Sequence, residues 1–282
     1  MAWPTTNMYP RVNIKITVPC LMAILLIFTG VAQQELSSDT HAESNNNTMC
    51  DVCNCSSIST EPPRVYVNCS DRQPHLQKLP TGFPPNIVEL DFSQNNIEPK
   101  FELPALLIYL YGQSNHLTDI FGMFNESVHV RVIYLRNNFI RAIPSGTFAA
   151  CHHLKNLDLQ SNCITSIPSG TFAACYQLRT LILSFNHIQE LNPESFLGLN
   201  KLTELELKGV QMTTLKANLF RELTRLNNVF ETLFISFEEL EHAEPGALNF
   251  SLLTLRFETG KLRFFPGGLF TPSNGETHFG EW

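Results

Sequence analysis

The sequence predicts a solenoid of the α/β class, in which short parallel strands from successive repeats stack side by side. The first observation is a phrase that occurs twice: IPSGTFAACHHL begins at Ile143, and IPSGTFAACYQL begins at Ile167, 24 positions later. The second is a ladder of leucines that recurs along the chain, and the third is an asparagine that follows the ladder. A fixed period of this length is typical of stacked repeats.

Each unit contains the pattern L-x-x-L-x-L, which predicts a short strand with its leucines on one side because strand side chains alternate. In the unit that begins at Leu154, Leu157 and Leu159 complete the strand, and Asn162 follows. A single unit cannot bury its apolar side alone, so neighbours must stack. Other units begin at Ile87, Leu107, Val130, Leu178, Leu202, Phe230 and Leu252, with Leu226 as an alternative start for the seventh.

Two slots of the pattern hold unexpected residues. Gly112 stands where a leucine is expected, which predicts poor packing in that unit, and Val210 stands in an asparagine slot. The asparagine side chain both donates and accepts, so it suits the backbone groups of the following turn. The unit that contains Val210 must satisfy those groups in another way.

These ladders resemble the leucine-rich repeat family in its extracellular form, whose repeats are about 24 residues long. The resemblance covers residues 87–270 and about eight repeats. It implies a curved solenoid with a parallel sheet on the concave face and an irregular or short-helical convex side.

The amino-terminal residues predict export. Arg11 and Lys15 precede an apolar run from Val18 to Phe28, and small residues lead to a cut near Ala32, so residues 1–32 are interpreted as a signal peptide. The run is shorter than the roughly 20 residues of a spanning helix, and no later stretch is long and apolar enough to cross a bilayer. Residues 33–49 are polar and predict a flexible leader, so we expect a secreted, extracellular protein.

Four cysteines cluster directly after the leader. Cys50, Cys53, Cys55 and Cys69 are interpreted as disulfide-bonded because the compartment is oxidising, and four cysteines allow three connectivities. Residues 50–86 resemble the cysteine-rich amino-terminal cap of extracellular leucine-rich repeat proteins. That resemblance implies the pairs Cys50–Cys55 and Cys53–Cys69.

Two further cysteines end the repeated phrase. Cys151 and Cys175 occupy the position of Leu199 in the next unit, so we expect two buried, small apolar residues. A disulfide between neighbouring coils is the alternative, because a coil spacing of about 5 Å lies within the Cα range of such a bond.

The carboxy-terminal end departs from the repeat. Residues 271–282 predict an irregular tail, and no cysteine follows Cys175, so no carboxy-terminal cap is expected. An uncapped solenoid exposes its last coil, which favours association with another chain through that end. A fragment or truncated product of a longer receptor is the other interpretation.

No catalytic constellation is present in the sequence. It lacks G-x-S-x-G, H-E-x-x-H, the P-loop and G-x-G-x-x-G, so we expect no enzyme activity, no bound metal and no cofactor. The net charge of −7 gives no basic footprint for nucleic acid.

Five N-x-S/T sequences are candidate glycan acceptors in an exported chain. We expect glycans at Asn46 in the leader and at Asn125 and Asn249 between repeats. Asn54 and Asn68 each neighbour a cap cysteine, where folding can close access first.

The residues between the inward leucines predict the binding surface. Tyr109, Tyr111 and Tyr134 occupy exposed slots with Arg136 nearby, and these residue types dominate binding energy at interfaces. We predict a ligand-binding patch formed by these four residues on the concave face. The competing interpretation is that tyrosines simply fit strands by propensity.

Two function classes remain. The first is a recognition ectodomain that binds protein or glycan ligands, because the pattern resembles Toll-like receptor ectodomains and variable lymphocyte receptors, which implies a role in innate immunity. The second is a structural matrix component resembling the small leucine-rich proteoglycans. The leader lacks a tyrosine cluster or an acidic attachment tract, which weakens the matrix interpretation.

Overall fold

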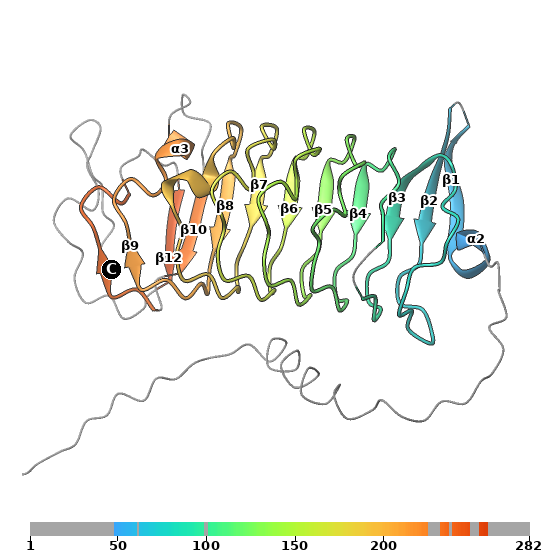
Figure 1. The fold of residues 1–282 in the computed structure, drawn as a ribbon, viewed down its shortest axis with the longest axis horizontal. Coiled ribbons are helices and arrows are strands. Elements are labelled where there is room, and N and C mark those ends of the chain that lie inside the picture. Colours follow the sequence, from blue (N-terminus) through green and yellow to red (C-terminus); the bar gives the residue numbers. More distant parts are fainter. Residues whose placement is uncertain are drawn as a thin grey trace, which may run out of the picture. The chain divides into compact units, whose positions relative to one another are not determined.

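The computed structural model describes residues 48–60, 62–98, 101–224, 232–236, 239–248 and 254–258. Within these residues a ten-stranded sheet runs in chain order from β1 to β12, with the strands side by side (Figure 1). β1 (Asn54–Thr60) and β2 (Pro63–Asn68) form an antiparallel hairpin, and every later pair in this sheet is parallel. The later strands are β3 (Ile87–Asp91), β4 (Tyr109–Tyr111), β5 (Val132–Tyr134), β6 (Asn156–Asp158), β7 (Thr180–Ile182), β8 (Glu204–Leu207), β10 (Thr232–Ser236) and β12 (Thr254–Glu258).

Each leucine ladder predicted from the sequence contains one of these parallel strands, so the predicted solenoid is confirmed. The return segments are mostly turns. Their regular elements are η1 (Pro193–Phe196), α3 (Arg221–Thr224) and a second parallel sheet of β9 (Thr214–Leu215) and β11 (His242–Ala243). Helix is therefore sparse among the described residues, and the parallel sheet dominates the architecture.

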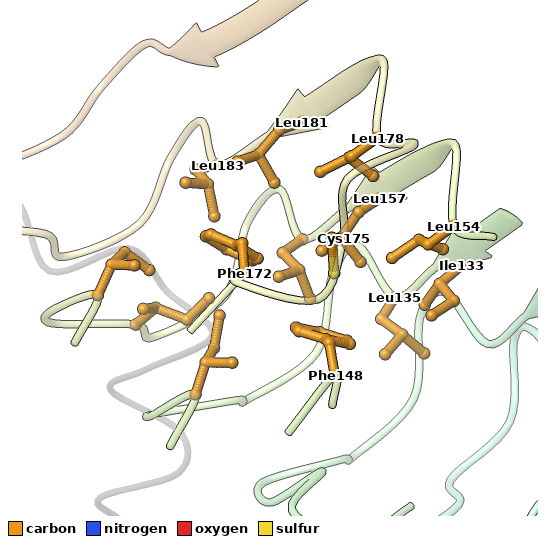
Figure 2. Close-up of a cluster of buried hydrophobic side chains, with 14 of the residues drawn as sticks. Ile133, Leu135, Phe148, Leu154, Leu157, Phe172, Cys175, Leu178, Leu181 and Leu183 are labelled. Atoms are coloured by element: carbon orange, nitrogen blue, oxygen red, sulfur yellow. The ribbon is translucent and has the colours of Figure 1, made fainter. Parts of the chain in front are cut away.

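The core is built from columns of equivalent residues in successive coils. The central strand residues are neighbours in register, and their side chains point into the core, where they are fully or almost fully buried (Figure 2). A column of five phenylalanines lies opposite them on the return segments. Its rings contact each other, with centroids 5.4 Å apart for Phe124–Phe148 and 6.0 Å apart for Phe148–Phe172. The members of this buried column are Phe124, Phe148, Phe172, Phe196 and Phe220.

The asparagines form a second kind of column, which is polar and buried. Asn138 accepts a hydrogen bond from the Leu117 N–H (3.1 Å) and donates to the carbonyls of Gly112 and Leu135 (both 3.0 Å). One amide therefore ties its own turn to the preceding coil. The same pattern recurs at Asn95, Asn115, Asn162 and Asn186.

The expectation of poor packing at Gly112 is wrong. The ring of Phe92, which is fully buried, fills the leucine slot: a Cβ added to Gly112 would lie 2.3 Å from Phe92 Cζ and 3.0 Å from Leu135 Cδ2. The missing side chain of one coil is replaced by an aromatic ring from the coil before it.

The amino-terminal end is closed by a short, disulfide-bonded cap. Cys50 is joined to Cys55 and Cys53 to Cys69, which are the pairs that the family resemblance implies. The cap begins before Cys50, because α2 (Met49–Val52) starts at Met49 and that side chain is fully buried in the core. Met49 therefore belongs with the cap and not with the leader.

Cys151 and Cys175 are free thiols buried in the core, so the expectation of two small apolar residues is confirmed and the disulfide alternative is wrong. Burial raises the pKa of the Cys151 thiol from 9.0 to about 12, and it also raises the pKa of Cys175. Both thiols are therefore protonated and unreactive at neutral pH.

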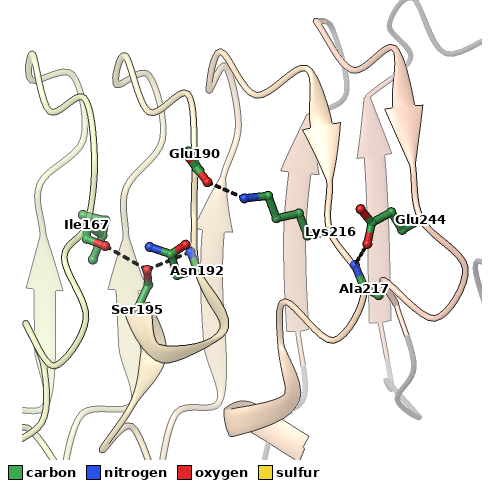
Figure 3. Close-up of polar contacts among 7 residues, drawn as sticks. All are labelled: Ile167, Glu190, Asn192, Ser195, Lys216, Ala217 and Glu244. Carbon is green, nitrogen blue, oxygen red and sulfur yellow. Dashed lines mark hydrogen bonds and ion pairs between the residues drawn. The ribbon is translucent and has the colours of Figure 1, made fainter.

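Polar contacts between return segments add further ties between coils (Figure 3). The buried Ser195 hydroxyl donates to the Ile167 carbonyl (2.8 Å) and accepts from the Asn192 N–H (3.0 Å). Lys216 forms an ion pair with Glu190 in the preceding coil. These contacts link neighbours only, as expected for a solenoid.

Several expectations concern residues outside the described part of the chain: the signal peptide, the leader up to residue 47, the tail at 271–282, and the acceptors Asn46 and Asn249. Asn125 is described, and its side chain is exposed in a turn. No helix among the described residues has the length and apolar character needed to cross a bilayer.

Candidate binding surface on the exposed side of the sheet

The strands β3 to β8 present two columns of side chains on the side of the sheet that faces away from the core. We call these two columns, together with Gln113 and Arg136, which lie two positions beyond Tyr111 and Tyr134, the sheet face. In the three-residue strands the central residue is buried and the residues beside it are mostly half-buried, because alternate side chains point to opposite sides. The first column is Glu89, Tyr109, Val132, Asn156, Thr180 and Glu204, and the second is Asp91, Tyr111, Tyr134, Asp158, Ile182 and Glu206.

The structure places the four predicted ligand-binding residues on this face. Tyr111 and Tyr134 are direct neighbours in register, and their rings meet edge to face with centroids 5.7 Å apart. Tyr109 pairs with Val132, so it lies beside the ring pair without joining it. Arg136 is exposed and makes no ion pair with a described residue.

A hollow of about 250 Å³ opens beside the ring pair. Its walls include Tyr134 and Arg136 from one coil and Asp158 from the next, so two of the four predicted residues line it. The other lining residues are Gln113, Asn156, Leu157, Thr180 and Ile182.

Asp158 is a functional candidate that the sequence analysis did not select. Its side chain is only 8% exposed, and its Oδ1 accepts a hydrogen bond from the Gln160 N–H (2.9 Å). Burial raises the pKa of this carboxyl group, while the Gln160 hydrogen bond and the Arg136 charge oppose that shift. The hollow therefore contains a partly desolvated carboxylate within the field of an arginine.

Gln113 is a second candidate that the sequence did not reveal. Its Oε1 atom is buried and has no hydrogen-bond partner among the described residues. Leaving a buried acceptor unpaired costs about 1–3 kcal/mol. Because Gln113 lines the hollow, a donor on a bound molecule would remove this cost.

Acidic groups flank the tyrosines on both sides of the sheet face. Burial raises the pKa of Glu89, and the neighbouring Asp91 raises it further. Burial also raises the pKa of Tyr111, with the charge of Glu89 as the next cause. At the other end, Glu206 has a raised pKa because of burial, although Lys208 opposes the shift. The surface thus combines aromatic rings with acceptors in a negative field.

The described residues contain no group of three or more His, Cys, Asp or Glu side chains placed to hold a metal ion. The polar side-chain groups of the hollow are instead two amides, a carboxylate, a guanidinium and two hydroxyls. This composition suits hydrogen bonding to another molecule.

Comparison with known families gives one match. The Leucine rich repeat model matches residues 128–187 and 176–230, a segment that includes β5 to β8 and most of the sheet face. The comparison with curated proteins found no match. Such solenoids serve in general as protein-interaction scaffolds, because their stacked strands create an extended surface. The described residues therefore form a parallel-sheet solenoid of the leucine-rich repeat type with a disulfide-bonded cysteine cap at its amino-terminal end, and residues 128–230 match the family model.

Proposed function

We propose that this protein is an extracellular recognition module that binds a protein ligand through the sheet face. Tyr109, Tyr111, Tyr134 and Arg136 form the centre of the contact. The observation that carries the proposal is the Tyr111–Tyr134 ring pair, which lies beside a hollow that contains an unpartnered buried acceptor.

The tyrosines are suited to binding because they are already held in place. Each ring projects from a short strand whose central residue is fixed in the core, and the two rings restrain each other. Side chains that are ordered before contact lose little conformational freedom on binding. Large aromatic residues of this kind are frequent hot spots at interfaces.

The chemistry of the hollow specifies the ligand group that would enter it. Asp158 and the Oε1 of Gln113 are acceptors, and Tyr134 contributes an aromatic ring to the lining. A lysine, arginine or amide side chain of a ligand supplies the donors that these acceptors need, and a cation also gains from the ring. Arg136 would then pair with a carboxylate on the ligand at the rim of the hollow.

The extracellular location rests on separate observations. The cap holds two disulfides, which persist in oxidising compartments. Residues 1–32 have the composition of a signal peptide, and Asn125 offers an exposed acceptor for a glycan. Asn46 and Asn249 are proposed as further acceptors.

The test uses the secreted full chain as a probe on an array of purified extracellular proteins, followed by equilibrium binding of each hit. Tyr111→Ala and Tyr134→Ala should each weaken binding about fivefold or more, which corresponds to about 1 kcal/mol. Tyr176→Ala is the matched control, because Tyr176 is a surface tyrosine that lies off the sheet face, stacked on His152.

Melting temperatures of all three variants establish whether the fold is retained. Normal binding by both sheet-face variants would show that the contact lies elsewhere. Binding confined to fibrous matrix proteins, and unaffected by these substitutions, would favour the structural matrix role instead.

A further inference from the structure

The segments that lead into the strands carry a concentration of positive charge. These segments are residues 62–65, 84–88, 104–108, 127–131, 151–155, 175–179 and 199–203, and we call them the strand-entry edge. They contain no aspartate or glutamate, although the whole chain has a net charge of −7. Their cations are Arg64, Arg131, Lys155, Arg179 and Lys201, with His129, His152 and His153 among them.

Backbone hydrogen bonds align three of these cations in a row. The Lys155 N–H donates to the Arg131 carbonyl, and the Arg179 N–H donates to the Lys155 carbonyl, each at 2.8 Å. The Thr203 N–H continues the series to the Arg179 carbonyl, also at 2.8 Å. Equivalent residues of neighbouring coils are about 5 Å apart, so Arg131, Lys155 and Arg179 form a continuous line across three coils.

A hollow of about 350 Å³ lies at the amino-terminal end of this line. Arg64 of the cap hairpin, Arg131, His129 and His153 contribute its polar walls. Val88, Leu106 and Ile108 are among its apolar residues. The cap and two repeats therefore bring their basic side chains to one concave place.

These cations are not neutralised within the described part of the chain. Arg64, Arg131 and Arg179 are exposed, and neither they nor Lys155 make a side-chain hydrogen bond or ion pair with a described residue. Two cations of the return segments are paired instead: Arg221 Nη2 lies 2.7 Å from Glu194 Oε1, and Lys216 forms an ion pair with Glu190. A row of unpaired like charges repels itself and attracts an anionic partner.

We propose that the strand-entry edge binds a sulfated polysaccharide chain at a site separate from the sheet face. An extended chain with anionic groups at regular intervals matches a line of cations at regular spacing, and guanidinium groups pair well with such oxyanions. The apolar residues of the hollow provide a surface for the faces of the sugar rings. This proposal rests on the extracellular location given in the proposed function.

Heparin immobilised on a column is the probe, and the full secreted chain is eluted with increasing sodium chloride. We expect elution well above physiological salt, about 0.15 M. The double variant Arg131→Gln/Arg179→Gln should elute at lower salt and bind soluble heparin about tenfold more weakly, because two charge-assisted contacts are lost.

The matched control is Lys216→Gln/Arg221→Gln, which removes the same amount of charge from another part of the chain. It should elute close to the unmodified protein. If Arg131→Gln/Arg179→Gln does not fold, the single variant Arg179→Gln is used instead, and its affinity for soluble heparin should fall about threefold.

Equal weakening by both double variants would mean that only net charge matters, and the proposal would be wrong. Elution of the unmodified protein below physiological salt would also overturn it. Tighter binding to polyglutamate or to DNA than to heparin would assign the edge to a different class of polyanion. Tyr111→Ala should leave heparin binding unchanged, and Arg131→Gln/Arg179→Gln should leave binding of the protein ligand unchanged, so the two proposals fail independently.

Discussion

The coils that contain buried asparagines and the coil that begins at Leu202 bury similar leucines but differ in their polar interior. In the first group each asparagine bonds backbone groups of two coils, as Asn186 does with the Ile164 N–H and the Leu159 carbonyl. In the second, Val210 occupies the slot and is buried. No described residue accepts a hydrogen bond from the Ile188 N–H. An asparagine in place of Val210 would accept that bond, as Asn186 does from the Ile164 N–H.

This difference separates two roles within one repeat. The leucines are interchangeable with other apolar residues, as Ile133 and Phe92 show, because burial depends on volume and area. The asparagine cannot be replaced by an apolar residue, because its amide forms hydrogen bonds with specific backbone donors and acceptors that would otherwise be buried unpaired. The regularity of the solenoid is therefore expected to depend most strongly on its polar column.

The strongest test of this view is the substitution Asn138→Ala. It leaves the Leu117 N–H and two carbonyls without their partner in the core, and each such group costs about 1–3 kcal/mol. We expect a loss of about 4 kcal/mol in the free energy of unfolding, measured by urea denaturation with the cap disulfides intact.

The same slot provides the control for this substitution. Val210→Ala removes only apolar volume, so we expect a loss of about 2 kcal/mol. Equal losses for Asn138→Ala and Val210→Ala would show that the amide contributes no more than its packing, and the distinction between the two groups of coils would collapse.

The second test concerns the coil that contains Gly112, which lacks a leucine in its sequence but is well packed in the structure. Gly112→Leu restores the family pattern, yet we expect it to destabilise the protein by about 1–3 kcal/mol because Phe92 already fills the space. Introducing Phe92→Ala together with Gly112→Leu should recover part of the loss, since the two side chains compete for one volume. A gain in stability from Gly112→Leu alone would show that the Phe92 ring can leave the slot at little cost.

The strand positions could be predicted from the sequence because a leucine ladder reports directly on which side chains are buried. The role of the asparagines could also be predicted from the sequence, since a polar residue at a fixed place in an apolar repeat needs hydrogen-bond partners when it is buried. The sequence did not predict that the Phe92 ring fills the space beside Gly112, because this packing depends on a contact between residues of two coils. Sequence periodicity describes each coil but does not specify how a large side chain reaches into the next.

The candidate site shows the same limit. The outward position of Tyr111, Tyr134 and Arg136 followed from alternation along the strand. The burial of Asp158 and of Gln113 Oε1 did not, because these groups lose solvent only through the side chains of neighbouring coils. Exposure of a slot on one strand is thus a poor guide to the exposure of the atoms that occupy it.

The smallest expected effect is at Ser127, a polar residue in the apolar part of the core. Ser127 follows Phe124 by three positions, as Cys151 follows Phe148, and the backbone bonds are the same: the Ser127 N–H donates to Phe124 (3.0 Å) and the Cys151 N–H to Phe148 (3.0 Å). Its hydroxyl is buried and has no partner among the described residues. Ser127→Ala should therefore stabilise the protein by about 1 kcal/mol, because an unpaired buried hydroxyl is removed.

Because Ser127 also completes the Asn125 glycan acceptor, the comparison is made in the Asn125→Gln background, where neither protein can carry that glycan. A rise of about 2–4 °C in melting temperature is expected for a change of this size. Ser195→Ala is the control: this hydroxyl is equally buried but bonds Ile167 and Asn192, so the same substitution should destabilise by about 1–3 kcal/mol. If Ser127→Ala lowers the melting temperature as Ser195→Ala does, the Ser127 hydroxyl has a partner such as a buried water, and this position belongs with the polar column after all.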